Sequence, residues 1–192
     1  MKLPDVILLN GTSSAGKSAL AGMLQARLPF IRMGIDDFVW ERVPSDWFEA
    51  IGQFLRGEGD ALAPQADQPF KMFRAFHRAV RACVGEGIGV IVDDAIISRA
   101  LLDDWVAALE GIDVFFVGVH CAADELVLRE RARRDRAPGS AVQAMARVHA
   151  HAIYDLEIDS TATSSSALAA QIIAALETRT RPGAFARMRA AG

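Results

Sequence analysis

One glycine-rich motif limits the possible folds and functions of this chain more than any other part of its sequence. Residues 11–18 read Gly-Thr-Ser-Ser-Ala-Gly-Lys-Ser, which matches the pattern G-x-x-x-x-G-K-S, and the apolar run Val6–Asn10 comes directly before them. The apolar residues Leu20, Leu24 and Leu28 follow at helical spacing. A buried strand, a glycine loop and a helix in this order form a phosphate-binding site. The sequence therefore predicts a nucleotide site near its amino terminus.

Each position of the motif has a chemical reason. Gly11 and Gly16 permit a tight turn and a close approach of the backbone, so that consecutive N–H groups can surround a β-phosphate. Lys17 supplies a positive charge toward the β- and γ-phosphates, and the Ser18 hydroxyl is placed to bind Mg²⁺. We therefore expect ATP and Mg²⁺ as cofactors. The predicted nucleotide-binding residues are Gly11, Thr12, Ser13, Ser14, Ala15, Gly16, Lys17 and Ser18.

The composition is that of one folded domain. The chain has 192 residues, of which 52% are hydrophobic and 23% charged, so we expect a single domain over residues 1–192. A net charge of −3 gives no general attraction to nucleic acid or to an anionic membrane. Apolar stretches are too short for a signal peptide or a membrane span, which favours a cytoplasmic protein. Cys83 and Cys121 lie in apolar surroundings and are expected to be reduced core thiols.

Strand-like and helix-like segments alternate along the chain. This alternation predicts an α/β fold in three layers, with a parallel sheet of about five strands flanked by helices. The tract 57–68 lacks periodicity and is expected to be a loop or lid, and residues after Arg181 a loosely held tail. After Val6–Asn10, the predicted strands are Ile31–Ile35, Gly89–Ala95, Val114–Cys121 and Leu156–Asp159. The predicted helices after the first are Phe70–Gly85, Ala100–Leu109, Ala122–Arg136, Val142–His151 and Ser166–Thr178.

Two pairs of aspartates follow predicted strands, where ligands bind in sheets of this kind. Asp36 could accept the proton of a substrate hydroxyl, because a kinase needs a carboxylate near the γ-phosphate. Asp37 is explained at least as well as a helix cap. Asp93 or Asp94 could hold a water on Mg²⁺, and the sequence does not choose between that role and capping. Asp93 and Ser18 are the predicted metal residues.

A row of arginines predicts a lid over the phosphates. Arg129, Arg133 and Arg136 are spaced to share one face of a helix, within a lid expected around residues 122–139. Arg133 and Arg136 are the better candidates for contact with the transferring phosphoryl group, together with Lys17. The alternative is a solvated helix with the ion pairs Glu125–Arg129 and Glu130–Arg134.

Aromatic residues are concentrated in the segment 38–70, where we expect the acceptor to bind. They could hold a flat apolar acceptor or belong to the core. His149 and His151 lie two apart on a predicted helix, so they face different directions, and the four histidines show no metal-binding spacing. The aromatics in question are Phe38, Trp40, Trp47, Phe48 and Phe54.

With these residues in place, the chain resembles the chloramphenicol phosphotransferase family from Ile7 to about Thr161. The ordered set of matching segments is more specific than the phosphate loop alone. These segments are Leu9–Ser18, Gly34-Ile35-Asp36, Val90–Asp94, Val117–Cys121, Ala132–Arg136, and His149 with Tyr154-Asp155.

The resemblance implies an ATP-dependent kinase that phosphorylates a hydroxyl of a small molecule, which in that family is the 3′-hydroxyl of chloramphenicol. It implies that Asp36 removes the hydroxyl proton and that Arg133 and Arg136 lie over the ATP phosphates. Between Asp36 and Gly89 the sequence departs from the family pattern. A kinase for another hydroxyl compound such as a sugar, and an ATP-binding switch that signals to a partner protein, are the alternative functions.

Overall fold

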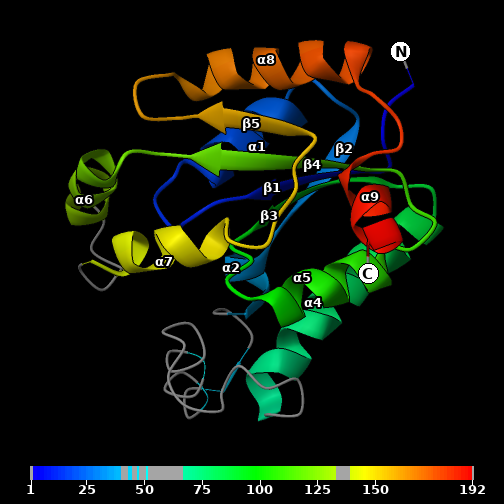
Figure 1. The fold of residues 1–192 in the computed structure, drawn as a ribbon, viewed down its shortest axis with the longest axis horizontal. Coiled ribbons are helices and arrows are strands. Elements are labelled where there is room, and N and C mark those ends of the chain that lie inside the picture. Colours follow the sequence, from blue (N-terminus) through cyan, green and yellow to red (C-terminus); the bar gives the residue numbers. More distant parts are fainter. Residues whose placement is uncertain are drawn as a thin grey trace.

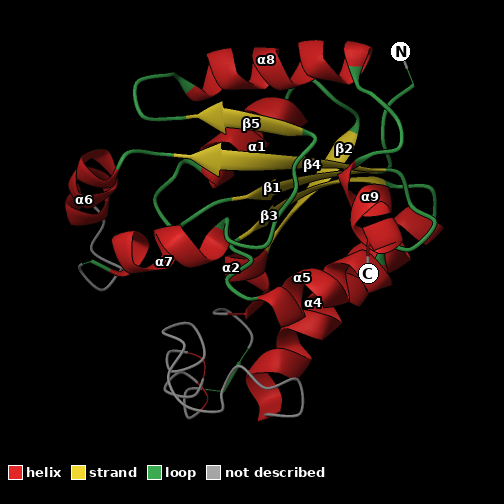
Figure 2. Ribbon diagram, viewed as in Figure 1, coloured by secondary structure: helices red, strands yellow, loops and turns green. Residues whose placement is uncertain are grey.

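The computed structural model describes residues 2–39, 43–44, 47, 51, 67–132 and 139–191. A five-stranded sheet forms its centre, and helices cover both faces (Figures 1 and 2). All the strand pairs are parallel, in the order β2-β3-β1-β4-β5. The predicted three-layer parallel architecture is therefore confirmed. The strands are β1 (Val6–Asn10), β2 (Phe30–Gly34), β3 (Gly89–Asp94), β4 (Val114–His120) and β5 (Leu156–Asp159).

The strand order brings distant loops together at one end of the sheet. β1 lies between β3 and β4, and its last residue, Asn10, pairs in register with Asp94 and Gly118. β1 is buried along its whole length because helices cover both of its faces. The loops that leave the carboxyl ends of β1 and β3 are consequently neighbours.

Alternate residues of the strands point into two separate cores. Ile7 and Leu9 pack on the face covered by α1 (Lys17–Gln25) and α8 (Ser165–Thr178). Val6 and Leu8 point to the other face, covered by α4 (Asp67–Gly85), α5 (Arg99–Ala108) and α9 (Ala184–Ala191). The remaining helices lie toward the carboxyl ends of the strands, on the left in Figure 1, and are α2 (Ile35–Val39), α6 (Ala123–Ala132) and α7 (Ser140–Val148).

The carboxyl-terminal segment corrects one prediction. The residues after Arg181 are not a loose tail, because α9 buries Ala184 and Phe185 completely. The Phe185 ring meets the Phe116 ring of β4 at a centroid distance of 5.2 Å. α9 therefore completes the core on its face of the sheet.

Several predicted boundaries also shift. The helix expected over residues 142–151 begins at Ser140 and ends at Val148, so His149 and His151 lie beyond it. α4 starts at Asp67, inside the expected loop 57–68, whose remaining residues lie outside the described part of the chain. Both Cys83 and Cys121 are free thiols, the first half-buried and the second buried. In the described part of the chain, no helix combines the length and apolarity needed to cross a bilayer.

Candidate active site

The phosphate loop joins β1 to α1 with unusual backbone angles. Gly16 caps the first turn of α1 with φ 85°, and Ser14 has φ 63°. Both values lie in the left-handed region, which at position 16 favours glycine. Gly11 is needed for a different reason, since a Cβ there would lie 2.5 Å from the Val119 carbonyl oxygen of β4. Gly11 thus permits close packing of two strands, whereas Gly16 permits the turn.

Two hydroxyls of this loop fit a phosphate group. The side-chain oxygens of Ser13 and Ser14 are buried and have no hydrogen-bond partner among the described residues. Lys17, itself buried, donates from Nζ to the Thr12 carbonyl at 2.9 Å. Buried polar groups are nearly always hydrogen-bonded, and a helix amino terminus favours an anion. The loop is therefore suited to the phosphates of a nucleotide.

Asp93 is the aspartate that reaches the phosphate loop. Its carboxylate accepts a hydrogen bond from Ser18 Oγ at 2.5 Å and lies 3.6 Å from Lys17 Nζ. Mg²⁺ in nucleotide sites takes one or two protein oxygens, with phosphates and waters as its other ligands. Ser18 and Asp93 could supply such oxygens together. The geometry thereby separates Asp93 from its neighbour in the sequence.

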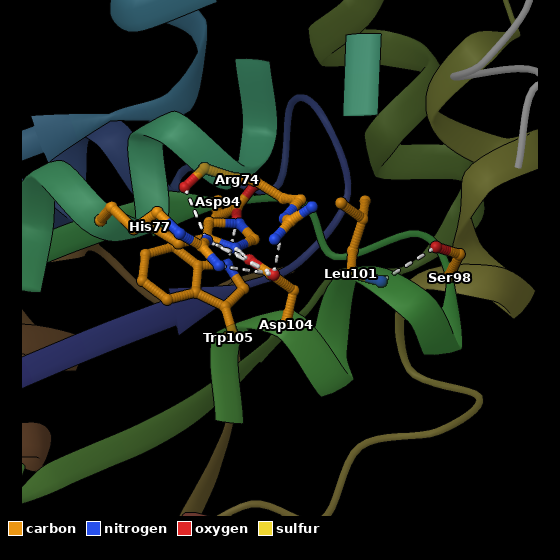
Figure 3. Close-up of polar contacts among 8 residues, drawn as sticks. Arg74, His77, Asp94, Ser98, Leu101, Asp104 and Trp105 are labelled. Carbon is orange, nitrogen blue, oxygen red and sulfur yellow. Dashed lines mark hydrogen bonds and ion pairs between the residues drawn. The ribbon is translucent and has the colours of Figure 1, made fainter. Parts of the chain in front are cut away.

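Asp94 turns away from this loop into a network with α4 and α5 (Figure 3). One carboxylate oxygen accepts from the Trp105 indole Nε1 at 2.6 Å and the other from the Ala95 N–H at 2.7 Å. The Trp105 ring stacks on the His77 ring with centroids 3.9 Å apart. Burial raises the pKa of Asp94 above its ordinary value, although His77, Trp105, Ala95 and the charge of Lys17 oppose this. Both oxygens of Asp94 are thus used to hold its surroundings.

The network continues from His77 toward the surface. His77 is fully buried, and its Nδ1 lies 2.6 Å from the Asp104 carboxylate. Arg74 and Arg78 of α4 also donate to Asp104. Burial alone would raise the pKa of Asp104, but the bonds with His77 and Arg78 outweigh it and lower that pKa to about 2. The sequence analysis missed this cluster, for which the spacing of Arg74, His77 and Arg78 on one helix was the only available signal.

Two cavities meet at the phosphate loop. The larger has a volume of about 440 Å³ and the second, beside the loop, about 320 Å³. Asp36 is exposed in the first turn of α2 and borders both cavities, whereas Asp37 borders the larger alone. The Asp37 carboxylate folds back toward Gly34, with Oδ2 3.0 Å from where a Cβ on Gly34 would lie. The residues that border both cavities are Ser13, Lys17, Ser18, Asp36 and Asp93.

The larger cavity has further walls that the sequence analysis did not identify. α7 contributes Gln143 and Arg147, and β2 contributes Arg32. The turn after β3 contributes Ala95 and Ile97. No sequence motif marks these positions, because the parallel sheet brings them together only when β2, β3 and α7 are in place.

Arg129 is the one predicted lid arginine within the described residues. Its Nε donates to Glu125 at 2.8 Å and its Nη2 to the Ser160 carbonyl at 2.6 Å. Its Nη1 lies 3.7 Å from where a Cβ on Gly16 would be, so the guanidinium reaches the phosphate loop. Arg133 and Arg136 lie outside the described part of the chain.

Glu130, which the sequence offered only as a possible ion-pair partner of Arg134, has a clear role in the fold. It is buried and binds the start of α7, accepting from Ser140 Oγ at 2.7 Å, from the Ala141 N–H at 3.0 Å and from the Gly139 N–H. Burial would raise the pKa of Glu130, but these hydrogen bonds lower it overall. Glu130 therefore joins α6 to α7 and is no solvated surface residue.

The aromatic residues after Asp36 that the structure describes pack against the core. The Phe38 ring lies 5.3 Å from the Phe76 ring, and Trp47 packs against the same buried cluster. This favours the core interpretation for these two. Trp40, Phe48 and Phe54 lie outside the described residues.

Comparison with known proteins gives results that agree with this geometry. Residues 4–177 match the family described as chloramphenicol phosphotransferase-like protein. A protein of Mycobacterium tuberculosis, provisionally named an O-phosphotransferase, is 35% identical over 203 residues, which span 96% of this chain and 87% of that protein.

Solved structures show the same fold at low sequence identity. A sugar kinase from Janibacter, without ligand, has a TM-score of 0.66 and 20% identity, with 90% of this chain and 94% of that chain covered. The APS kinase of Mycobacterium tuberculosis, in complex with AMPPNP and APS, has a TM-score of 0.58 and 14% identity, with 90% and 96% covered. The fold is that of the P-loop kinases.

Proposed function

This chain belongs to the chloramphenicol phosphotransferase-like family, and we propose that it is an ATP-dependent O-phosphotransferase acting on a hydroxyl of a small molecule, with chloramphenicol as the first candidate acceptor. The donor nucleotide would occupy the phosphate loop and the acceptor the larger cavity.

The position of Asp36 carries this proposal. Asp36 borders both the cavity at the phosphate loop and the larger cavity, as Lys17 and Ser18 do. A transferring phosphoryl group must lie at such a junction, in line between the donor and the acceptor oxygen. A carboxylate there can take the proton from the attacking hydroxyl.

The chain's own residues would supply positioning and charge. Phosphoryl transfer passes through a loose transition state, so most of the rate comes from alignment and neutralisation. Lys17 neutralises the β- and γ-phosphates, and the Ser13 and Ser14 hydroxyls donate to phosphate oxygens. Ser18 and Asp93 would hold Mg²⁺, which when bound offsets charge on the phosphates.

Arginines on the lid side would act on the same group. Arg129 is held by Glu125 and Ser160 with its guanidinium above Gly16, which suits contact with a phosphate. We assign Arg133 and Arg136 to the same task from the sequence pattern alone.

A polyhydroxylated acceptor such as a sugar is a second candidate. The larger cavity is bordered by Arg32, Asp37, Gln143 and Arg147 in addition to Asp36. Several separate donors and acceptors around one cavity suit a molecule with several hydroxyls.

Mass spectrometry of candidate acceptors tests both functions. Chloramphenicol and D-gluconate are each incubated with the protein, ATP and Mg²⁺, with Asp36→Asn and Asp103→Asn in parallel. Asp103 is exposed on α5 and borders neither cavity. We expect one acceptor to gain a single phosphate, Asp36→Asn to lower turnover by roughly 10²- to 10⁴-fold, and Asp103→Asn to stay active.

Two results would contradict parts of the proposal, and a third would decide between the two acceptors. Full activity in Asp36→Asn would remove the assigned base. Phosphorylation of gluconate alone would replace the antibiotic by a polyhydroxylated acceptor. ATP binding without any phosphorylated product would favour the ATP-binding switch.

A further inference from the structure

A single buried side chain joins the phosphate loop to two walls of the larger cavity. Asn10 is the last residue of β1, is fully buried and directly precedes Gly11. Its Nδ2 donates to the Val148 carbonyl at 2.9 Å and to the Tyr154 hydroxyl at 2.8 Å. Its Oδ1 accepts from the Ile96 N–H at 2.9 Å. An asparagine amide has two donors and one acceptor oxygen, so all three functions of this amide are engaged.

The segments that Asn10 holds are those that border the larger cavity. Val148 is the last residue of α7, the helix that places Gln143 and Arg147 on the cavity wall. Ile96 lies between Ala95 and Ile97, which border the cavity from the turn after β3. Asn10 thereby fixes both walls to the strand from which the phosphate loop departs.

A second layer of residues orients the Asn10 amide. The Tyr154 hydroxyl accepts from Asn10 and lies 2.7 Å from His149 Nδ1. Burial, with a further contribution from His120, lowers the pKa of His149 to about 4, so its ring is neutral at neutral pH and can accept from the hydroxyl. Gly118 leaves space for the tyrosine, since a Cβ there would lie 2.7 Å from the ring. Tyr154 therefore both accepts and donates, and its position is fixed from two sides.

We propose that Asn10 is a positioning residue. When a nucleotide binds to the phosphate loop, Asn10 couples this binding to the positions of α7 and of the turn after β3. These two segments border the acceptor cavity, so the coupling places the acceptor relative to the γ-phosphoryl group. Its catalytic consequence rests on the proposed function, whereas the coupling itself requires only that a nucleotide binds. A purely structural asparagine would lower stability and affect every step alike. A positioning asparagine affects turnover and the coupling more than nucleotide affinity.

Hydrogen exchange measured by mass spectrometry tests the coupling without an acceptor. AMPPNP with Mg²⁺ is added to the unmutated protein, to Asn10→Ala and to Tyr154→Phe. In the unmutated protein we expect the nucleotide to slow exchange in residues 140–150 and 94–98 by roughly 5- to 150-fold, the usual range for coupled sites. In Asn10→Ala the slowing should persist in residues 11–18 and disappear from the other two segments. Tyr154→Phe, which keeps the bond to Val148, should show an intermediate loss.

A matched variant separates positioning from a general loss of stability. Asp113→Ala removes a side chain that binds Arg179 and Arg181 at the opposite end of β4, remote from the cavities. We expect it to keep the full exchange pattern and to keep turnover. Asn10→Ala should bind AMPPNP within about threefold of the unmutated protein and lose roughly 10²-fold in kcat with whichever acceptor is identified.

Three results would overturn the inference. They are no slowing of exchange in residues 140–150 of the unmutated protein, an unchanged slowing in Asn10→Ala, or equal effects of Asn10→Ala and Asp113→Ala. Failure to phosphorylate any acceptor would contradict the proposed function and leave the exchange result to decide the role of Asn10.

Discussion

The two aspartates that end β3 are neighbours in sequence, yet they belong to regions of opposite character. Asp93 faces the phosphate loop, where it meets Ser18 and Lys17 at the border of two cavities. Asp94 also borders the larger cavity, but it points to the other face of the sheet, as successive strand residues do, and both of its oxygens bind protein donors. The same chemical group can serve a ligand or the fold, and the difference lies in which partners surround it.

Buried polar atoms without a partner occur in both regions, but their surroundings differ. Around Asp93, the Ser13 and Ser14 hydroxyls have no hydrogen-bond partner among the described residues, and both serines border a cavity. Around Asp94, Trp105 and Ala95 donate to the carboxylate and the Trp105 ring stacks on His77. His77 Nδ1 bonds to Asp104, while His77 Nε2 has no partner among the described residues. The first region offers hydroxyls to a ligand at a cavity, whereas the second links α4 to α5.

The largest expected effect comes from Asp93→Asn. The substitution removes the charge beside Ser18 and Lys17 but keeps the shape of the side chain, so turnover should fall by roughly 10²- to 10³-fold and require more Mg²⁺. Initial rates over a series of Mg²⁺ concentrations measure this. The free energy of unfolding should change less than in Asp94→Asn. If Asp93→Asn keeps turnover within about threefold of the unmutated protein, Asp93 has no greater role in catalysis than Asp94.

Asp94→Asn should act on stability instead. Both Asp94 oxygens accept hydrogen bonds, so an amide must place its NH₂ against either the Trp105 or the Ala95 donor. We expect a loss of about 1–3 kcal/mol in the free energy of unfolding, with little change in AMPPNP affinity. Urea unfolding and calorimetric titration give the two values. A variant that unfolds normally but no longer binds AMPPNP would assign Asp94 to the nucleotide site.

The smallest expected effect is a dependence on acid that originates at Asp104. Its pKa is about 2 in the folded protein against an ordinary 3.8, so the unfolded chain takes up the proton first as the pH falls. The stabilisation is therefore complete above about pH 4 and is lost between about pH 4 and pH 2.

Chemical unfolding at pH 5 and at pH 3 checks this for the unmutated protein and for Asp104→Asn. Between pH 5 and pH 3, we expect the free energy of unfolding to fall more in the unmutated protein than in Asp104→Asn, because the variant lacks the carboxylate that titrates. Other carboxylates with lowered pKa values, such as Asp113 and Glu130, contribute equally to both proteins and cancel in the difference. Equal losses would show that the network does not depend on the charge of Asp104.

Features written in local sequence could be predicted, whereas those made by the sheet could not. The phosphate loop and the alternation of strands and helices depend on neighbouring residues, and both the motif and the fold class followed from them. The choice between Asp93 and Asp94 depends on which face of β3 each side chain takes, which required the register with β1. From the sequence alone, Asp93 and Asp94 are equally good candidates for the metal site.

Contacts between distant elements explain what the sequence did not show and the wrong prediction of a loose tail after Arg181. In the sequence, Glu130 is one of many charged residues in a predicted helix. In the structure, it accepts hydrogen bonds from the start of α7. The segment after Arg181 is rich in alanine and arginine, which does not indicate a buried helix. Its burial depends on Phe185 packing against the Phe116 ring of β4, a contact between elements far apart in the sequence. The network of His77 and Asp104 spans α4 and α5, so the helical spacing of Arg74, His77 and Arg78 shows only one half of it.

The packing of α9 also bears on how this chain would tolerate truncation. Phe185 and Ala184 of α9 are buried, and the Phe185 ring packs against Phe116 of β4. A chain cut before residue 184 would therefore leave apolar surface around Phe116 open to water, and such surface promotes aggregation. A short helix remote from the phosphate loop thus helps to keep the folded protein from self-association.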